Sequence, residues 1–185
     1  MKVKFAHLII LLIVGCLACD SARKEVKMEK LPYFDLKGFM DLEVAKLDGV
    51  SVSKVSRING NEKSAEVTLS SQEWKEEFQA FYEADINKPS LALSYSTNAY
   101  FEYLIHALLP DEKGNVKEIK IKYNKDYPSS ITFKMKNENL FFSTATSGEF
   151  YLNQVTQKLD HYTIETTQKV VFMKPTNIKI SGVVR

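Results

Sequence analysis

Residues 119–123 read Ile-Lys-Ile-Lys-Tyr, and residues 131–136 read Ile-Thr-Phe-Lys-Met-Lys. In both stretches apolar side chains alternate with polar ones, which is the period of an extended strand with one buried and one solvated face. The same pattern returns in three later segments, Leu140–Thr146, Tyr162–Phe172 and Ile178–Val184. Short turns separate these segments, so the second half of the chain is expected to form an antiparallel sheet.

The apolar segment Ala99–Leu109 precedes this pattern and fits both a strand and a helix. Its aromatic residues are dense, and Pro110 and Gly114 bound an expected turn directly after it. Aromatic enrichment next to a turn favours a strand over a helix. We therefore expect one strand over Ala99–Leu109.

The first half of the chain predicts two helices with a hairpin between them. Apolar residues fall on one helical face over Tyr33–Leu47, which indicates an amphipathic helix. Asn59-Gly60 is a strong hairpin signal, because both turn positions need positive φ. Ser70-Ser71-Gln72-Glu73 is a capping box, and it begins a helix that carries four large residues at helical spacing, Trp74, Phe78, Phe81 and Ile86.

The element order is therefore helix, hairpin, helix, and then strands joined by short turns. Because helices and strands do not alternate in the second half, the fold class is α+β. We expect two amphipathic helices packed on one face of a curled, mainly antiparallel meander sheet of about six to eight strands.

The N-terminus has the organisation of a secretory signal peptide. Lys2 and Lys4 precede an unbroken apolar run over Leu8–Val14, and small residues and cysteine follow. The run is much shorter than the roughly 20 residues of a permanent membrane-spanning helix. We therefore expect this segment to direct export.

Ile13-Val14-Gly15-Cys16 resembles the lipobox of bacterial lipoproteins. The resemblance implies that Cys16 is lipidated and becomes the new N-terminus. Cys19 is the alternative, because Ala18 precedes it and the polar pair Asp20-Ser21 follows it. The expected organisation is a signal peptide over 1–15, a lipidated tether over 16–31 and a single domain over 32–185, which looks like the globular part of a short envelope lipoprotein.

The resemblance also implies a location and a partner. The protein is expected in the cell envelope, with its domain outside the cytoplasm and its covalent lipid in a membrane, the outer membrane of a Gram-negative bacterium. The formal net charge of +2 is too small to indicate a nucleic-acid partner. Both cysteines lie in the leader region, so the domain has no internal disulfide.

No motif in the sequence indicates catalysis, a cofactor or a metal. The spacings of familiar zinc sites are absent, as are a Gly-x-Ser-x-Gly nucleophile motif and a glycine-rich phosphate loop. His106 and His161 are the only histidines after the leader, and each is expected to be a structural or surface residue. An enzyme is therefore the least favoured class of function.

The candidate ligand or partner surface combines lysines on the polar strand faces with tyrosines whose amphipathic rings suit an interface, namely Tyr100, Tyr103, Tyr123, Lys120, Lys122, Lys134 and Lys136. Such a surface suits anionic headgroups, polysaccharide or another protein. The ordinary alternative is a solvated face whose lysines prevent edge pairing.

Two functions stay open at this point. One is a binding or scaffold module, with another envelope protein as its partner. The other is a carrier of an apolar ligand or lipid in a cavity between sheet and helices, by analogy with bacterial lipid-transfer proteins of similar element order. An open apolar pocket would favour the carrier, and a filled core would favour the scaffold.

Overall fold

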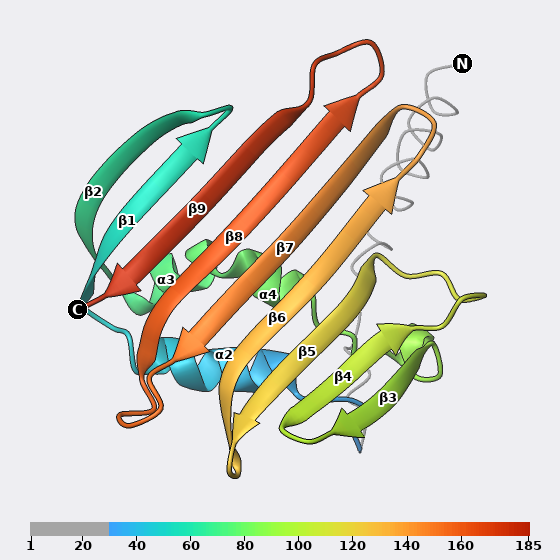
Figure 1. The fold of residues 1–185 in the computed structure, drawn as a ribbon, viewed down its shortest axis with the longest axis horizontal. Coiled ribbons are helices and arrows are strands. Elements are labelled where there is room, and N and C mark those ends of the chain that lie inside the picture. The colour runs from blue at the N-terminus through green and yellow to red at the C-terminus, as the bar shows by residue number, and fades with distance from the viewer. Residues whose placement is uncertain (1–29) are drawn as a thin grey trace, which may run out of the picture.

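A single nine-stranded antiparallel sheet dominates the computed structural model, which describes residues 30–185 (Figure 1). The predicted signal peptide, Cys16 and Cys19 lie outside the described residues. The strands are β1 (Val50–Ile58), β2 (Asn61–Leu69), β3 (Tyr95–Tyr100), β4 (Tyr103–Leu108), β5 (Val116–Asn124), β6 (Tyr127–Glu138), β7 (Phe142–Leu152), β8 (Leu159–Val170) and β9 (Thr176–Val184). The helices are α2 (Leu36–Ala45), α3 (Ser71–Glu77), α4 (Gln79–Glu83) and the 3-10 turn η2 (Pro89–Leu91).

The strand order is β2-β1-β9-β8-β7-β6-β5-β4-β3. Strands β3 to β9 follow one another as a meander, and the hairpin β1–β2 pairs with β9, so segments from the two ends of the domain meet in one sheet (Figure 1). The prediction of a mainly antiparallel sheet is confirmed. The expected six to eight strands are too few, and the molecule is more strongly dominated by its sheet than an α+β class suggests.

Two expected elements are interrupted in the structure. The segment Ala99–Leu109 is not one strand, because Phe101 adopts a φ of 50° and turns the chain between β3 and β4. The second helix does not run unbroken from Ser70 to Ile86, since Phe78 leaves helical geometry between α3 and α4. Dense aromatic residues indicated regular structure in both places. The break at Phe78 places its ring in the core, whereas the turn at Phe101 leaves Tyr100 and Phe101 exposed.

The local signals at the element ends are confirmed. Ser70 Oγ accepts a bond from the Glu73 amide, and the Glu73 carboxylate accepts one from the Ser70 amide at 2.8 Å. Asn59 and Gly60 both have positive φ in the β1–β2 turn. The two bonds satisfy unpaired amides at the start of α3. The tight turn fixes the register of the β1–β2 hairpin.

Aromatic rings fill the space between the helices and the sheet. Phe78 lies 4.9 Å from Tyr162 and 5.4 Å from Phe150, measured between ring centroids, and Phe81 lies 4.8 Å from Phe133. All of these rings, and Trp74 beside them, are at most 1% exposed. Edge-to-face packing of this kind is favourable beyond the area it buries.

Glycines on neighbouring strands make room for two of these rings. Gly148 in β7 is the cross-strand partner of Phe133, and Gly182 in β9 is the partner of Tyr162. A Cβ at either position would collide with the ring opposite. The glycines therefore allow large side chains to lie flat on the sheet.

The long strands have a covered half and an extended half. The covered half lies under the helices and includes Phe133, Phe150 and Tyr162, whereas the extended half comprises 134–138, 142–146, 165–170 and 176–180 and contains no buried residue. In Figure 1 the strands reach beyond the helices toward the β6–β7 and β8–β9 turns. None of the helices in the described part of the chain is long and apolar enough to cross a membrane.

Candidate functional site

Three of the predicted residues, Tyr103, Lys120 and Lys122, meet on the face of the sheet opposite the aromatic core. Ile119, Ile121 and Phe133 point into the core, so the intervening residues point the other way. Tyr103 of β4 is the cross-strand partner of Lys122 of β5. The Nζ atoms of Lys120 and Lys122 lie 5.1 Å and 5.8 Å from the centroid of the Tyr103 ring, within the range of a cation–π contact.

A second aromatic pair extends this group on the same face. Tyr151 of β7 and His161 of β8 are cross-strand partners, and their rings stack at 4.5 Å with an interplanar angle of 18°. Burial raises the pKa of the Tyr151 phenol, Glu149 raises it further, and the nearby Lys122 partly opposes both. We call Tyr103, Lys120, Lys122, Tyr151 and His161 the lysine–tyrosine surface.

The sequence did not predict the contact between Tyr151 and His161. Alternation places each side chain on a face, but their contact depends on the register of β7 against β8, which no local signal determines. Asp160 also contacts His161, with 2.7 Å between Asp160 Oδ2 and His161 Nδ1. The stacked rings of Tyr151 and His161 join β7 to β8 on this face.

The remaining predicted residues are distributed more widely. Lys134 pairs with Glu118 at 3.2 Å, and Lys136 pairs with Glu138 at 2.6 Å, so their charges are locally balanced. Tyr100 is two-thirds exposed beside Phe101 at the β3–β4 turn. Tyr123 packs against the core, and burial raises the pKa of its phenol, so it does not belong to the exposed surface.

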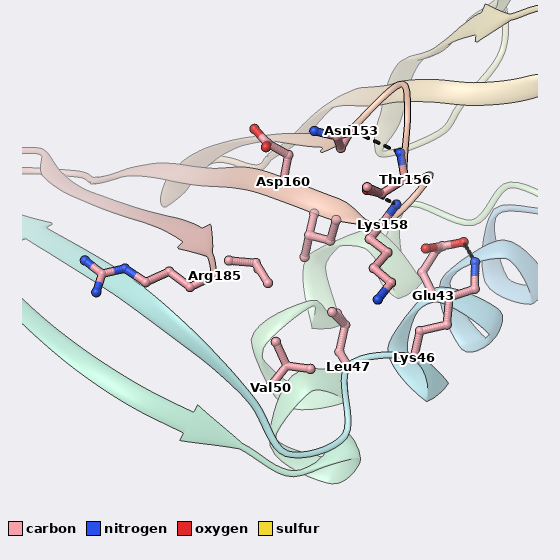
Figure 2. A pocket seen from close by; sticks show the side chains of 11 residues that line it. Glu43, Lys46, Leu47, Val50, Asn153, Thr156, Lys158, Asp160 and Arg185 are labelled. Atoms are coloured by element: carbon pink, nitrogen blue, oxygen red, sulfur yellow. Dashed lines mark hydrogen bonds and ion pairs between the residues drawn. The ribbon is translucent and has the colours of Figure 1, made fainter.

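A separate pocket of about 330 Å³ lies at the C-terminal end of α2 (Figure 2). Apolar side chains line one part of it, including Leu47, Val50 and Leu159. The loop between β7 and β8 closes another side with Asn153, Thr156 and Lys158. The end of α2 lines one side of the pocket and the ends of β8 and β9 line the other, so the pocket lies at the edge of the space between helix and sheet.

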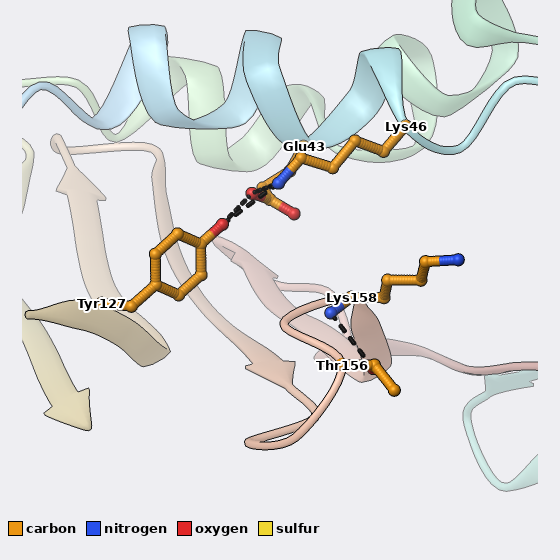
Figure 3. Close-up of polar contacts among 5 residues, drawn as sticks. All are labelled: Glu43, Lys46, Tyr127, Thr156 and Lys158. Atoms are coloured by element: carbon orange, nitrogen blue, oxygen red, sulfur yellow. Dashed lines mark hydrogen bonds and ion pairs between the residues drawn. The ribbon is translucent and has the colours of Figure 1, made fainter. Parts of the chain in front are cut away.

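A buried carboxylate stands at the wall of this pocket (Figure 3). Glu43 is 2% exposed, and its Oε1 atom lies 2.6 Å from Lys46 Nζ and accepts a 2.7 Å bond from the Tyr127 hydroxyl. Burial lowers the pKa of Lys46, but the bonds to Glu43 and Tyr127 outweigh it, so the pKa is raised overall. The three groups connect α2 to β6 and satisfy one another.

Most charges around the pocket have partners of their own. Arg185 pairs with Glu66 at 2.8 Å, and Asp160 is held by His161. Lys158 has no carboxylate partner among residues 30–185, and its side chain extends into the pocket (Figure 2). Among the described residues that line the pocket, Lys158 is thus the one cation without a carboxylate partner, and it lies beside an apolar wall. None of these residues has the arrangement of a nucleophile and its base.

Comparison with known proteins identifies no relative of this chain: no family model, no curated protein and no solved structure matches it.

Proposed function

We propose that the protein is a noncatalytic binding module of the bacterial cell envelope. Lipid on Cys16, or on Cys19 as the alternative, anchors it to a membrane, with residues 32–185 outside the cytoplasm. In this proposal the short helices cover one face of a curled sheet. The opposite face then carries the partner.

The filled aromatic core is the observation that carries this choice. Trp74, Phe78 and Tyr162 occupy the space in which a carrier would hold its apolar ligand, and their rings are in contact. Ligand pockets commonly have volumes of about 300–1,000 Å³ with largely apolar walls. The pocket beside α2 has the volume but is ringed by charged side chains, which supports binding at the surface over transport of an apolar ligand.

The lysine–tyrosine surface is the proposed contact with the partner. Lys120 has no carboxylate partner within the described part of the chain, so its charge is available to an acidic group. Aromatic rings with polar tips are enriched at protein interfaces, because they bury area while keeping a hydrogen bond to water. An acidic surface on another envelope protein fits this chemistry.

The anchor is tested by the mass of the native protein. We expect the mass of a chain cleaved before Cys16 with attached acyl chains, and we expect Cys16→Ser to lose both the acyl mass and retention in the membrane fraction after a high-salt wash. If Cys16→Ser has no effect, Cys19→Ser is expected to show the loss. An unprocessed chain, or a double variant retained after the wash, contradicts the anchor.

The partner surface is tested by cross-linking in cells. A photoreactive amino acid at Thr132, the cross-strand partner of Lys120, is expected to form an adduct with a second envelope protein. Lys120→Glu with Lys122→Glu should abolish the adduct. The matched pair Lys37→Glu with Lys63→Glu reverses the same charge at exposed sites elsewhere and should retain it. An adduct insensitive to the first pair would contradict this assignment.

A further inference from the structure

Five large apolar side chains project into solvent at the end of the extended half. Leu140 and Phe141 lie in the β6–β7 turn and are 88% and 72% exposed. Val171, Phe172 and Met173 lie in the β8–β9 turn, where Phe172 is fully exposed. We call these five residues the apolar tip. Other exposed apolar residues, such as Leu42 and Val155, are not part of this group, and scattered residues of that kind are usual on protein surfaces.

The two turns form one structure. The Val171 amide donates to the Phe141 carbonyl at 2.9 Å, which joins the β8–β9 turn to the β6–β7 turn. The turns leave the sheet side by side at the same end of the molecule (Figure 1). The five side chains therefore make one apolar surface from two separate segments of sequence.

Backbone hydrogen bonds hold the tip in its exposed geometry. Asn139 Oδ1 accepts from the amides of Phe141 and Phe142 at 2.8 Å and 3.0 Å, which fixes the first turn. Met173 donates to the Val170 carbonyl at 3.1 Å in the second turn. Phe172 has a φ of 64°, an uncommon conformation for a bulky residue. Phe172 therefore faces solvent because the turn directs it there.

The tip is not a continuation of the core. On the face that carries Tyr162 and Phe150, the next positions along β7 and β8 include Thr146 and Thr166, whose hydroxyls lie 3.1 Å apart. Beyond them Thr144 pairs with Gln168. A polar belt thus separates the aromatic core from the apolar tip, so the tip has no partner inside the described fold.

Positive charge surrounds the tip. Segments 136–143 and 169–175 contain three lysines, Lys136, Lys169 and Lys174, and one acidic residue, Glu138. Glu138 pairs with Lys136 at 2.6 Å, and that contact lowers the pKa of its carboxyl. Apolar side chains flanked by lysines match the chemistry of a bilayer with anionic headgroups, where the rings enter the acyl boundary and the ammonium groups stay at the headgroups.

The shape of the tip favours a bilayer over a protein. The exposed side chains project from two separate turns. A stable protein interface needs a complementary surface on the partner. A bilayer accepts two projecting turns without such complementarity.

We propose that the apolar tip binds anionic lipid bilayers by inserting Phe141 and Phe172 at the interface while Lys169 and Lys174 contact the headgroups. This contact does not depend on the lipid anchor or on the lysine–tyrosine surface. It gives the molecule a defined orientation at a membrane, with the long axis of strands β6–β9 directed toward the bilayer.

The test places a fluorescent probe at the tip of the full chain. In a Cys16→Ser, Cys19→Ser background, Phe172→Cys is labelled with an environment-sensitive dye, and Val155→Cys at the opposite end of the sheet, also 91% exposed, serves as the control. Vesicles of phosphatidylcholine with phosphatidylglycerol are expected to shift the emission at position 172 to the blue. Nitroxide-labelled lipids should quench that emission and leave the probe at position 155 unchanged.

Unlabelled variants, which lack the Phe172→Cys and Val155→Cys changes, test the lysines and the aromatic rings separately. Binding to the anionic vesicles is measured by co-sedimentation. Lys169→Gln and Lys174→Gln are each expected to weaken binding about fivefold and to have little effect on phosphatidylcholine alone. Phe141→Ser with Phe172→Ser should weaken it about tenfold or more, whereas Val155→Ser should not. The unfolding midpoint of each variant, measured in parallel, should stay at that of the parent because these side chains are exposed.

Three outcomes would overturn the proposal. The first is a probe at position 172 that does not respond to vesicles. The second is a blue shift that grows with protein concentration in the absence of lipid, which would mean that a second copy covers the tip. The third is a blue shift without lipid at every concentration, which would mean that another part of the same chain covers it.

Discussion

The covered and extended halves are made from the same strands but differ in what holds them. In β7, Phe150 is fully buried beneath Phe78, whereas Thr146, on the same face and four residues away, is bonded only across the sheet. The difference follows the helices, which stand over one half alone (Figure 1). One face of an alternating strand is thus buried only where a second element packs against it. Elsewhere, hydrogen bonds and side-chain contacts between neighbouring strands hold the sheet together.

Along each strand the side chains on the core face change from apolar to polar where the strand passes beyond the helices. Tyr162 and Ile164 of β8 lie under the helices, and Thr166 and Gln168 follow on the same face. Threonine suits a strand with two solvated faces, because it favours extended backbone and bonds across the ladder. The apolar tip departs from this trend, because its side chains are both apolar and exposed. Its exposure therefore indicates a binding partner, whereas the exposure of the polar belt does not.

The largest expected effect comes from removing a ring in the covered half. Trp74→Ala should lower the free energy of unfolding by about 3–5 kcal/mol, the usual cost of a large aromatic truncation in a core. Phe172→Ala removes an aromatic ring from the tip and should change the free energy of unfolding by less than about 0.5 kcal/mol. Chemical denaturation of both variants measures the contrast. Equal losses would mean that the two halves are not distinct in stability.

Sequence patterns predicted features that one segment determines better than features that depend on two neighbouring segments. The capping box at Ser70 and the turn at Asn59-Gly60 are local, since each satisfies its own backbone groups, and both were recognised. Phe172 was assigned to a strand, because alternation continues from Val170, but in the structure it lies in the β8–β9 turn. Its left-handed conformation depends on the neighbouring turn, and no pattern within one segment shows that.

The candidate surface was only partly predictable for the same reason. Alternation placed Lys120 and Lys122 on the polar face correctly. Tyr123 was included for its amphipathic ring, but alternation sets it on the same face as Ile119 and Ile121, and in the structure the ring packs against the core. The contact between Tyr151 and His161 joins two strands, so only the three-dimensional register reveals it.

A smaller effect is expected from filling the space that a glycine leaves in the covered half. Gly148→Ala would place a methyl group against the Phe133 ring, and overpacking of this kind costs about 1–3 kcal/mol. Phe133→Leu should relieve part of the collision, so the double variant should lose less than the sum of the single losses. Denaturation of the four chains measures the coupling. Strict additivity would show that the glycine is not needed for the ring.

The smallest of the three effects is a pH dependence of the covered half. His106 is 2% exposed, its Nε2 accepts from the Phe34 amide at 3.1 Å, and its Nδ1 contacts Thr97 Oγ1 at 2.9 Å. Burial lowers the pKa of this imidazole in the folded protein. Below about pH 6.5, the ordinary histidine value, the unfolded chain therefore binds more protons than the folded one.

Stability is then highest above that pH and falls as the pH drops toward the folded-state pKa of His106. Protonation of Nε2 also removes the acceptor of the Phe34 amide, and one hydrogen bond contributes about 0.5–1.5 kcal/mol. His106→Gln keeps a polar side chain but does not titrate, so its unfolding free energy should vary less between pH 7 and pH 5 than that of the parent. An unchanged slope would place the pH dependence in other groups. His106 contacts the segment that leads into α2, so a reduced slope would show that the helical cover is sensitive to protonation. The ladder of the extended half has no buried titratable group among the described residues, and it is not expected to contribute to that slope.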